Sequence, residues 1–216
     1  MTMTMEEVLS GTAKPHPRPA TLALEDGTVL RGRSCGAAGE AFGEICFNTS
    51  VVGYPEVITD ASYAGQIVVM TYPQIGNYGM TEADAQGTPA LRGLVVRDMC
   101  ATPSNWRADM SLPEYLVREG IVAIEGVDTR ALVERIRTAG VMRAVISTED
   151  ADAASLLAKV RRSPSLVGEN LARTVSCAAP YECTTANPAF DFAWTRAVAG
   201  ATGEGAAGPA APARAY

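Results

Sequence analysis

The first half of the chain carries short apolar runs of the kind that form β-strands. Two runs with alternating apolar positions flank Glu25-Asp26-Gly27, and an Asp-Gly pair between such runs predicts a tight β-hairpin. The segment GEICFNTS predicts a strand over about 44–49. The run QIVVMTYP is continuously apolar at its start, which is typical of a strand buried on both faces. The segment LRGLVVRDM predicts a further strand.

The second half alternates helical and strand patterns. Ser111 and Glu114 have the spacing of a capping box ahead of a short helix that Gly120 would end. Asp128 can cap a second helix, with Gly140 in the stop position. The runs IVAIEGV and MRAVIS predict strands, and TEDADAASLLAKVRRSP predicts an amphipathic helix with acids in its first turn and arginines in its last. Together the two halves predict a mixed α/β domain with an antiparallel and a parallel part.

Composition sets the limits of this domain. Residues 1–19 are polar and rich in proline, and the end of the chain is rich in Ala, Gly and Pro. Such segments bury too little side-chain surface to offset the entropy of ordering. We therefore expect a disordered leader over 1–19, a folded domain over 20–175 and a tail over 176–216.

Charge and residue usage exclude several classes of protein. The formal charge of −6 argues against binding to nucleic acid or to an anionic membrane. The five cysteines show no C-x-x-C spacing and the one histidine is His16, which argues against a disulfide framework and a metal site. The leader lacks the pattern of a secretory signal, and no run of about 18 apolar residues exists. We expect a cytoplasmic protein that does not bind a membrane.

The common catalytic motifs are absent from the sequence. It contains no P-loop, no G-x-G-x-x-G after a strand and no nucleophile elbow. A serine or cysteine nucleophile would depend on His16 as its base. Paired carboxylates remain possible, but the spacing of Glu and Asp singles out no pair. The composition therefore argues against a self-contained hydrolase, and no catalytic residue is assigned.

A set of motifs in fixed order carries a family resemblance. The segments are LEDGTVLRGRSCG, GEICFNTSVVGYPEVITDASYAGQIVVMTYPQIGNYG, GLVVRD, SNWR and IEGVDTRALVERIRTAG. From about residue 20 to about residue 185, the chain resembles the amino-terminal domain of the small subunit of glutamine-hydrolysing carbamoyl phosphate synthases. The resemblance implies a three-layer β/β/α swivelling domain with a mixed antiparallel and parallel sheet arrangement.

The resemblance also implies a function in a larger ligase. In the family, a class I amidotransferase domain follows and hydrolyses glutamine with a Cys, a His and an acid. The ammonia passes to a large subunit, which uses ATP and bicarbonate to make carbamoyl phosphate for arginine and pyrimidine synthesis. The implied partners are this large subunit, as a heterodimer, and glutamine through the amidotransferase domain. No cofactor is implied for this chain, because ATP and magnesium act on the large subunit.

The sequence departs from the family pattern after the resembling region. The amidotransferase domain is missing, and residues 176–216 read as a linker remnant followed by the Ala/Gly/Pro-rich tail. We expect the chain to be inactive by itself, because the Cys-His-Glu triad is not in it. Two alternatives remain open, a stand-alone docking or regulatory module for the large subunit and a truncated product without function.

The resemblance assigns one ligand contact. The serine of the family motif T-D-x-S-Y reaches the glutamine site of the neighbouring domain, and by position this residue is Ser62. The alternative is that the Ser62 hydroxyl only caps a turn. Trp106 in the cluster SNWR is either an interface anchor or a half-buried loop residue. Tyr54 is expected in the core or at its rim, and Cys46 as a small buried apolar residue.

Overall fold

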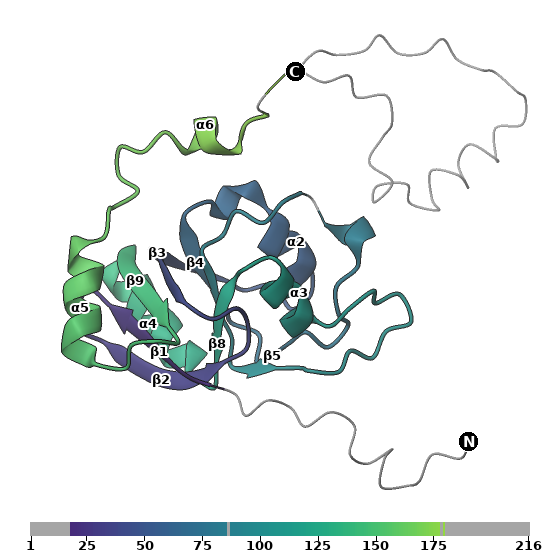
Figure 1. Cartoon of the computed structure of the whole chain (residues 1–216), viewed down its shortest axis with the longest axis horizontal. Helices are drawn as coiled ribbons and strands as arrows, with labels where there is room; N and C mark the ends of the chain where they lie inside the picture. The colour runs from purple at the N-terminus through teal and green to yellow at the C-terminus, as the bar shows by residue number, and fades with distance from the viewer. Residues whose placement is uncertain (1–17, 86, 178, 180–216) are drawn as a thin grey trace, which may run out of the picture.

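The computed structural model describes residues 18–85, 87–177 and 179. The expected leader, apart from Arg18 and Pro19, and the expected tail from residue 180 onward lie outside the described residues. The domain between them contains a barrel of strands with helices packed around it (Figure 1).

Seven strands close into the barrel within the described part of the chain. They are β1 (Pro19–Leu24), β2 (Val29–Ser34), β3 (Glu40–Asn48), β4 (Gln66–Met70), β6 (Gly93–Val95), β8 (Val122–Glu125) and β9 (Met142–Ser147). Their order around the barrel is β1-β2-β8-β6-β4-β3-β9, and β9 pairs with β1 to close the ring.

The barrel has an antiparallel and a parallel part. The β1–β2, β1–β9, β2–β8 and β3–β9 pairs are antiparallel. The β3–β4, β4–β6 and β6–β8 pairs are parallel. The predicted mixed α/β class and mixed sheet are therefore confirmed. The strand pairing gives a closed barrel rather than a stack of three separate layers, because the first and last strands meet.

The local signals in the sequence account for the first strands. The β1–β2 hairpin turns at Glu25-Asp26-Gly27, where Gly27 has a φ of 97° that favours glycine. The predicted strand at 44–49 starts earlier, at Glu40. The β4 strand is buried on both faces as predicted: Ile67 packs in one apolar cluster and Val68 in another.

One predicted strand divides into two. The segment LRGLVVRDM forms β6 in the barrel and β7 (Asp98–Met99), which pairs with β5 (Gln74–Ile75) in a separate two-stranded sheet. The break follows Val96, whose N–H donates to the Ile124 carbonyl at 3.0 Å. The β5 strand is part of the segment TYPQIGN, and β7 begins at the last residue of GLVVRD.

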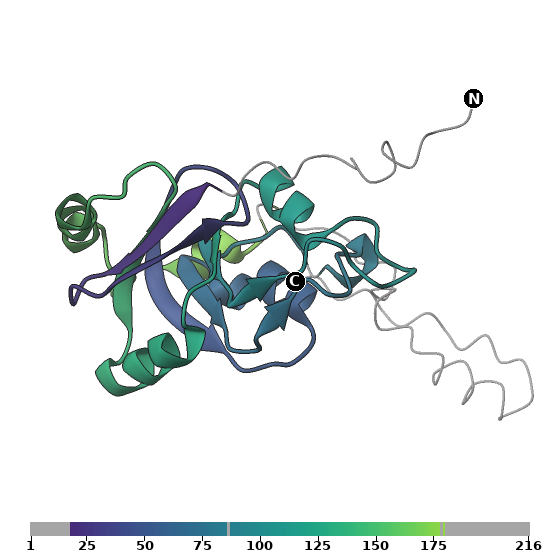
Figure 2. The ribbon, with the colours of Figure 1, turned by 90° about the horizontal axis from the view of Figure 1, so that it is seen from below.

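The helices cover the barrel on different sides. They are α2 (Tyr54–Thr59), α3 (Leu112–Arg118), α4 (Thr129–Ala139), α5 (Ala153–Arg162) and α6 (Leu171–Val175), with short 3-10 turns η1 (Ala61–Tyr63) and η2 (Glu82–Asp84). Figure 2 shows α4 and α5 at one end of the molecule and α2 and α3 further along it.

The predicted helix caps are present, with one correction. Ser111 and Glu114 form both hydrogen bonds of the capping box of α3, and Asp128 accepts from the Ala131 N–H at 3.0 Å to cap α4. The prediction that acidic residues occupy the first turn of the third helix is wrong. Helix α5 starts later, at Ala153, so Asp152 is its N-cap instead.

No helix among the described residues combines the length and apolarity that a membrane crossing requires.

Candidate functional site

Ser62 lies at the middle of η1, directly before β4. Its N–H donates to the Asp60 carboxylate at 2.8 Å, so Asp60 caps this turn and not the Ser62 hydroxyl. The Ser62 side chain is exposed, and its hydroxyl has no hydrogen-bond partner within the described part of the chain. The turn therefore fixes the backbone of Ser62 and leaves its hydroxyl available. A glutamine contact at Ser62 stays a prediction.

Asn48 joins the Ser62 turn to a neighbouring loop. Its side-chain amide donates to the Tyr63 hydroxyl at 2.9 Å and its amide oxygen accepts from the Ser50 N–H at 2.7 Å. Its backbone carbonyl accepts from the Thr71 N–H at 3.0 Å. The F-N-T-S and T-D-x-S-Y motifs are thus connected through one side chain at the end of β3.

A pair of stacked tyrosines connects two more motifs. The rings of Tyr54 and Tyr78 lie 4.2 Å apart, and the Tyr78 hydroxyl accepts from the N–H groups of Gly53 at 2.6 Å and Tyr54 at 3.1 Å. The Tyr54 hydroxyl accepts from the Tyr78 N–H at 3.2 Å and donates to the Gly79 carbonyl at 2.8 Å. Burial raises the pKa of both hydroxyls, so both stay neutral and Tyr54 keeps the proton that it donates to Gly79. The prediction that Tyr54 belongs to the core is confirmed, since it is 1% exposed.

The loop with the SNWR motif is held to the same region. The Ser104 N–H donates to the Asn77 carbonyl at 2.8 Å, and the Asn105 side chain donates to the Tyr78 carbonyl at 3.2 Å. Trp106, the next residue along this loop, is 92% exposed. The alternative of a half-buried loop tryptophan is therefore wrong.

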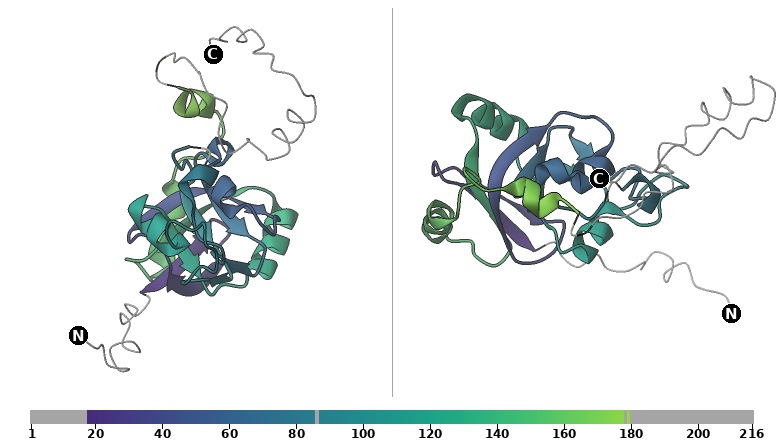
Figure 3. Two further views of the ribbon diagram at one scale, coloured as in Figure 1. Left: turned by 90° about the vertical axis from the view of Figure 1, so that its right-hand side faces the viewer. Right: turned by 90° about the horizontal axis from the view of Figure 1, so that it is seen from above.

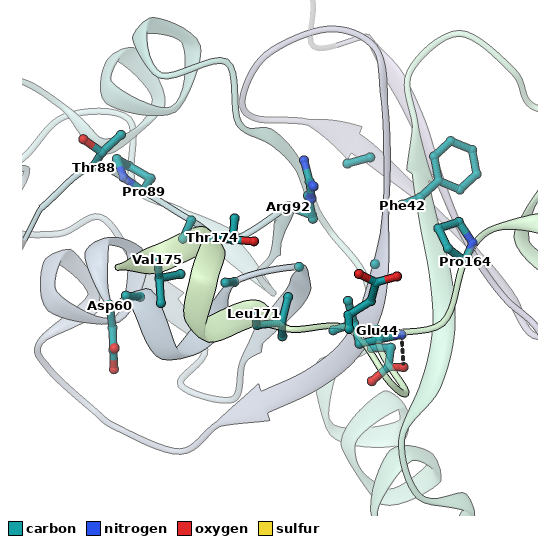
Figure 4. A pocket seen from close by; sticks show the side chains of 18 of the residues that line it. Phe42, Glu44, Asp60, Thr88, Pro89, Arg92, Pro164, Leu171, Thr174 and Val175 are labelled. Atoms are coloured by element: carbon teal, nitrogen blue, oxygen red, sulfur yellow. Dashed lines mark hydrogen bonds between the residues drawn. The ribbon is translucent and has the colours of Figure 1, made fainter. Parts of the chain in front are cut away.

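A wide groove of about 1230 Å³ opens beside the Ser62 turn. Asp60 and Ala61 line one part of it, and Glu44 and Arg92 line another. Figure 4 shows these walls together with Leu171 and its neighbours in α6. Ser62 itself is next to the groove in the chain but does not line it.

The cysteines of the barrel are poor nucleophiles. Burial raises the pKa of the Cys46 thiol to about 11. Burial, together with the nearby Glu125 carboxylate, raises the pKa of the Cys35 thiol as well. A reactive cysteine needs the opposite shift, because the thiolate is the nucleophile. Cys46 is partly buried in an apolar cluster, in line with the expected packing role.

The described residues contain no group of His, Cys, Asp and Glu side chains that could hold a metal ion. The arrangement as a whole offers an exposed hydroxyl, an exposed indole and a groove, all on a hydrogen-bonded frame. These features can bind a polar group or a protein surface.

Two residues that position the site, Asp60 and Asn48, were not predicted from the sequence. Asp60 stands two residues before Ser62, which is the spacing of an Asx turn and could have identified the capping residue. Asn48 gave no such signal, because its partners Tyr63 and Thr71 come next to it only through the β3–β4 pairing.

Comparison with known proteins identifies a matching family and close relatives of this chain. Residues 22–146 match the family model described as the carbamoyl-phosphate synthase small chain, CPSase domain. The chain is 53% identical over 174 residues to the carbamoyl phosphate synthase small chain of Thermosynechococcus vestitus, covering 80% of this chain and 46% of the relative. It is 54% identical over 176 residues to that of Thermotoga maritima, covering 81% and 44%. The chain thus spans less than half the length of these curated relatives.

A solved structure of an aminopeptidase from Aneurinibacillus sp. strain AM-1 is a distant match, with a TM-score of 0.34 and 15% identity. It covers 61% of this chain and 30% of that chain.

Proposed function

Because the chain belongs to the family of carbamoyl phosphate synthase small chains, we propose that it supports glutamine hydrolysis and docks the large subunit of that enzyme. In this proposal an amidotransferase domain binds glutamine, and Ser62 adds a hydrogen bond to the substrate from the neighbouring domain. ATP and magnesium act on the large subunit, and this chain holds no cofactor of its own.

The observation that supports this proposal is the state of Ser62. An exposed hydroxyl on a turn whose backbone is capped by Asp60 can meet a polar group of a ligand without reorganisation. A serine hydroxyl can both donate and accept, so it suits the amide, the carboxylate or the ammonium of glutamine.

We expect the chain alone to hydrolyse no glutamine. Burial raises the pKa of the thiols of Cys35 and Cys46, and the one histidine of the sequence is His16. Neither feature provides a thiolate with a base beside it. The activity is therefore expected only when an amidotransferase domain is added.

The Ser62→Ala variant tests the ligand contact. The chain is combined with an amidotransferase domain from a relative and with a large subunit, and glutamine-dependent carbamoyl phosphate formation is measured. Loss of one neutral hydrogen bond of about 1 kcal/mol is expected to raise the KM for glutamine about two- to tenfold. Synthesis from added ammonia should stay unchanged, because it bypasses glutamine.

Ser50→Ala is the matched control, since Ser50 is an exposed serine of the adjacent loop whose N–H alone bonds to Asn48. An equal KM for the Ser62 and Ser50 variants would contradict the ligand contact. Measurable glutamine hydrolysis by the pure chain would contradict the wider proposal.

Trp106 supports the docking part of the proposal. Besides the bonds of Ser104 and Asn105 before it, the loop is fixed after Trp106: the Thr81 hydroxyl donates to the Arg107 carbonyl at 3.0 Å, and the Arg107 guanidinium pairs with Asp84 at 3.2 Å. An exposed indole on a fixed loop loses little conformational entropy on binding, and tryptophan is common among residues that dominate interfaces. The loop thus offers a rigid anchor for a protein partner.

We expect Trp106→Ala to weaken binding to the large subunit by about 2 kcal/mol, or roughly 30-fold in Kd. Val141→Ala, at another exposed apolar position, is the control and should bind as the parent chain does. Isothermal titration calorimetry measures both. Equal affinities of the two variants would place the interface elsewhere.

The same exposed loop favours a second candidate function, a docking module that regulates the large subunit. In that case the chain binds the large subunit, yet an added amidotransferase domain restores no glutamine-dependent synthesis. A truncated product without function would neither bind the large subunit nor unfold in a cooperative thermal transition.

A further inference from the structure

The segment that follows α5 is fixed to the barrel at its start. The Glu44 carboxylate accepts from the Ser165 hydroxyl at 3.0 Å and from the Leu166 N–H at 2.9 Å. Leu166 also fills the space in front of Gly65, where a Cβ would lie only 2.7 Å from a methyl carbon of Leu166. We call residues 164–175 the strap, and Figure 4 shows its start beside Glu44.

The far end of the strap is not fixed. Helix α6 has five residues, Leu171–Val175, and none of them is buried. A helix this short does not persist in water without packing. Fixing the backbone of its first turn loses more conformational entropy than its few hydrogen bonds compensate. Figures 1 and 3 show α6 standing apart from the barrel on an extended segment. The helix therefore needs a surface to pack against.

Three apolar side chains of the strap have the spacing of a packing face. Val167, Leu171 and Val175 recur every four residues, and Val167 and Val175 are 88% and 40% exposed. Leu171 and Val175 fall on one face of α6 and both line the groove. Ala172 and Arg173 do not line it.

The opposite wall of the groove complements this face. Ala61 and Pro89 provide apolar surface there, and Asp60 provides an acidic group. The wall also carries the cation Arg92, and the strap's Glu169, which lines the groove as well, offers it an opposite charge.

We propose that the groove is the docking surface of the strap itself, and that α6 closes onto it with Leu171 and Val175 against the Ala61 and Pro89 wall. The fixed point at Leu166 lies only a few residues before α6, so the tether keeps α6 at an effective concentration on the order of millimolar. The closed strap covers the wall beside the Ser62 turn, and any partner that occupies the groove displaces it. This inference concerns the chain alone and does not rest on the proposed function.

Hydrogen–deuterium exchange of the full chain tests this closure. In the parent chain, amides of residues 167–176 are expected to exchange at least about tenfold more slowly than in an unstructured peptide of the same sequence. Leu171→Asp places a charge on the packing face and should remove this protection. Ala172→Asp is the matched control, because it adds the same charge to the same helix away from the groove, and it should keep the protection.

A variant of the opposite wall provides a second test. Ala61 is exposed and lines the groove, so Ala61→Arg should release the strap as Leu171→Asp does. Slow exchange of the β4 amides confirms in each case that the barrel is folded. Exchange of the parent strap at the unstructured rate overturns the proposal, as does an equal effect of Leu171→Asp and Ala172→Asp. Protection that grows with protein concentration also overturns it, because the occupant is then a second copy.

Discussion

Replacing Tyr54 by alanine is expected to lower the free energy of unfolding by about 4 kcal/mol. Tyr54 is 1% exposed, its ring stacks on Tyr78, and its hydroxyl bonds to the backbone of Tyr78 and Gly79. The variant loses the packed ring, leaves a cavity and leaves two backbone groups without partners. Urea unfolding followed by circular dichroism measures the change.

Two further variants identify what Tyr54 contributes to stability. One separates the hydroxyl from the ring, and the other is a control at an exposed tyrosine. Tyr54→Phe keeps the ring and removes the hydroxyl, so it should cost about 2 kcal/mol. Tyr72→Ala, at a tyrosine that is 36% exposed, should cost less than about 1 kcal/mol. If Tyr72→Ala destabilised the chain as much as Tyr54→Ala, the stacked pair would not be the centre of this region.

Replacing Gly43 by alanine is expected to lower the free energy of unfolding by about 3 kcal/mol. A Cβ at Gly43 would lie 2.5 Å from the Gly65 carbonyl oxygen, and its other nearest neighbours are backbone atoms of Gln66 and Ile67. Backbone cannot rotate away as a side chain can. The β3 and β4 strands would have to separate where the Glu44 N–H donates to that same carbonyl at 3.3 Å.

Gly87→Ala is the control for this change. Among the described residues, no heavy atom lies within 4 Å of a Cβ placed on Gly87. Alanine there should leave the free energy of unfolding within about 1 kcal/mol of the parent value. A Gly43 variant as stable as the Gly87 variant would show that the strands can move apart without loss.

The parts of the fold that follow from local chemistry could be predicted from the sequence. The turn at Asp26-Gly27 and the caps at Ser111 and Asp128 depend on residues only a few positions apart. The closure of the barrel does not, because the pairing of Thr21 with Ser147 joins the two ends of the domain. The division of LRGLVVRDM depends likewise on the distant partner strands of β6 and β7.

The candidate site shows the same distinction. Ser62 was identified through a family motif, and its turn could be understood from Asp60 alone. The groove required the structure, because its walls come from β3, the Ser62 turn, the segment before β6 and the strap. The exposure of Trp106 could also be determined only from the structure, since a tryptophan in a polar loop can be buried or exposed.

The pairing of β1 with β9 has a consequence for folding during synthesis on the ribosome. The barrel cannot close until Ser147 has been synthesised, long after Thr21 has left the ribosome. At roughly 5–20 residues per second, β1 waits on the order of ten seconds for its second neighbour. During that time Leu22 and Leu24, fully buried in the finished barrel, face solvent with only the β2 strand beside them. The nascent chain is therefore expected to be a client of ribosome-associated chaperones until its last strand emerges.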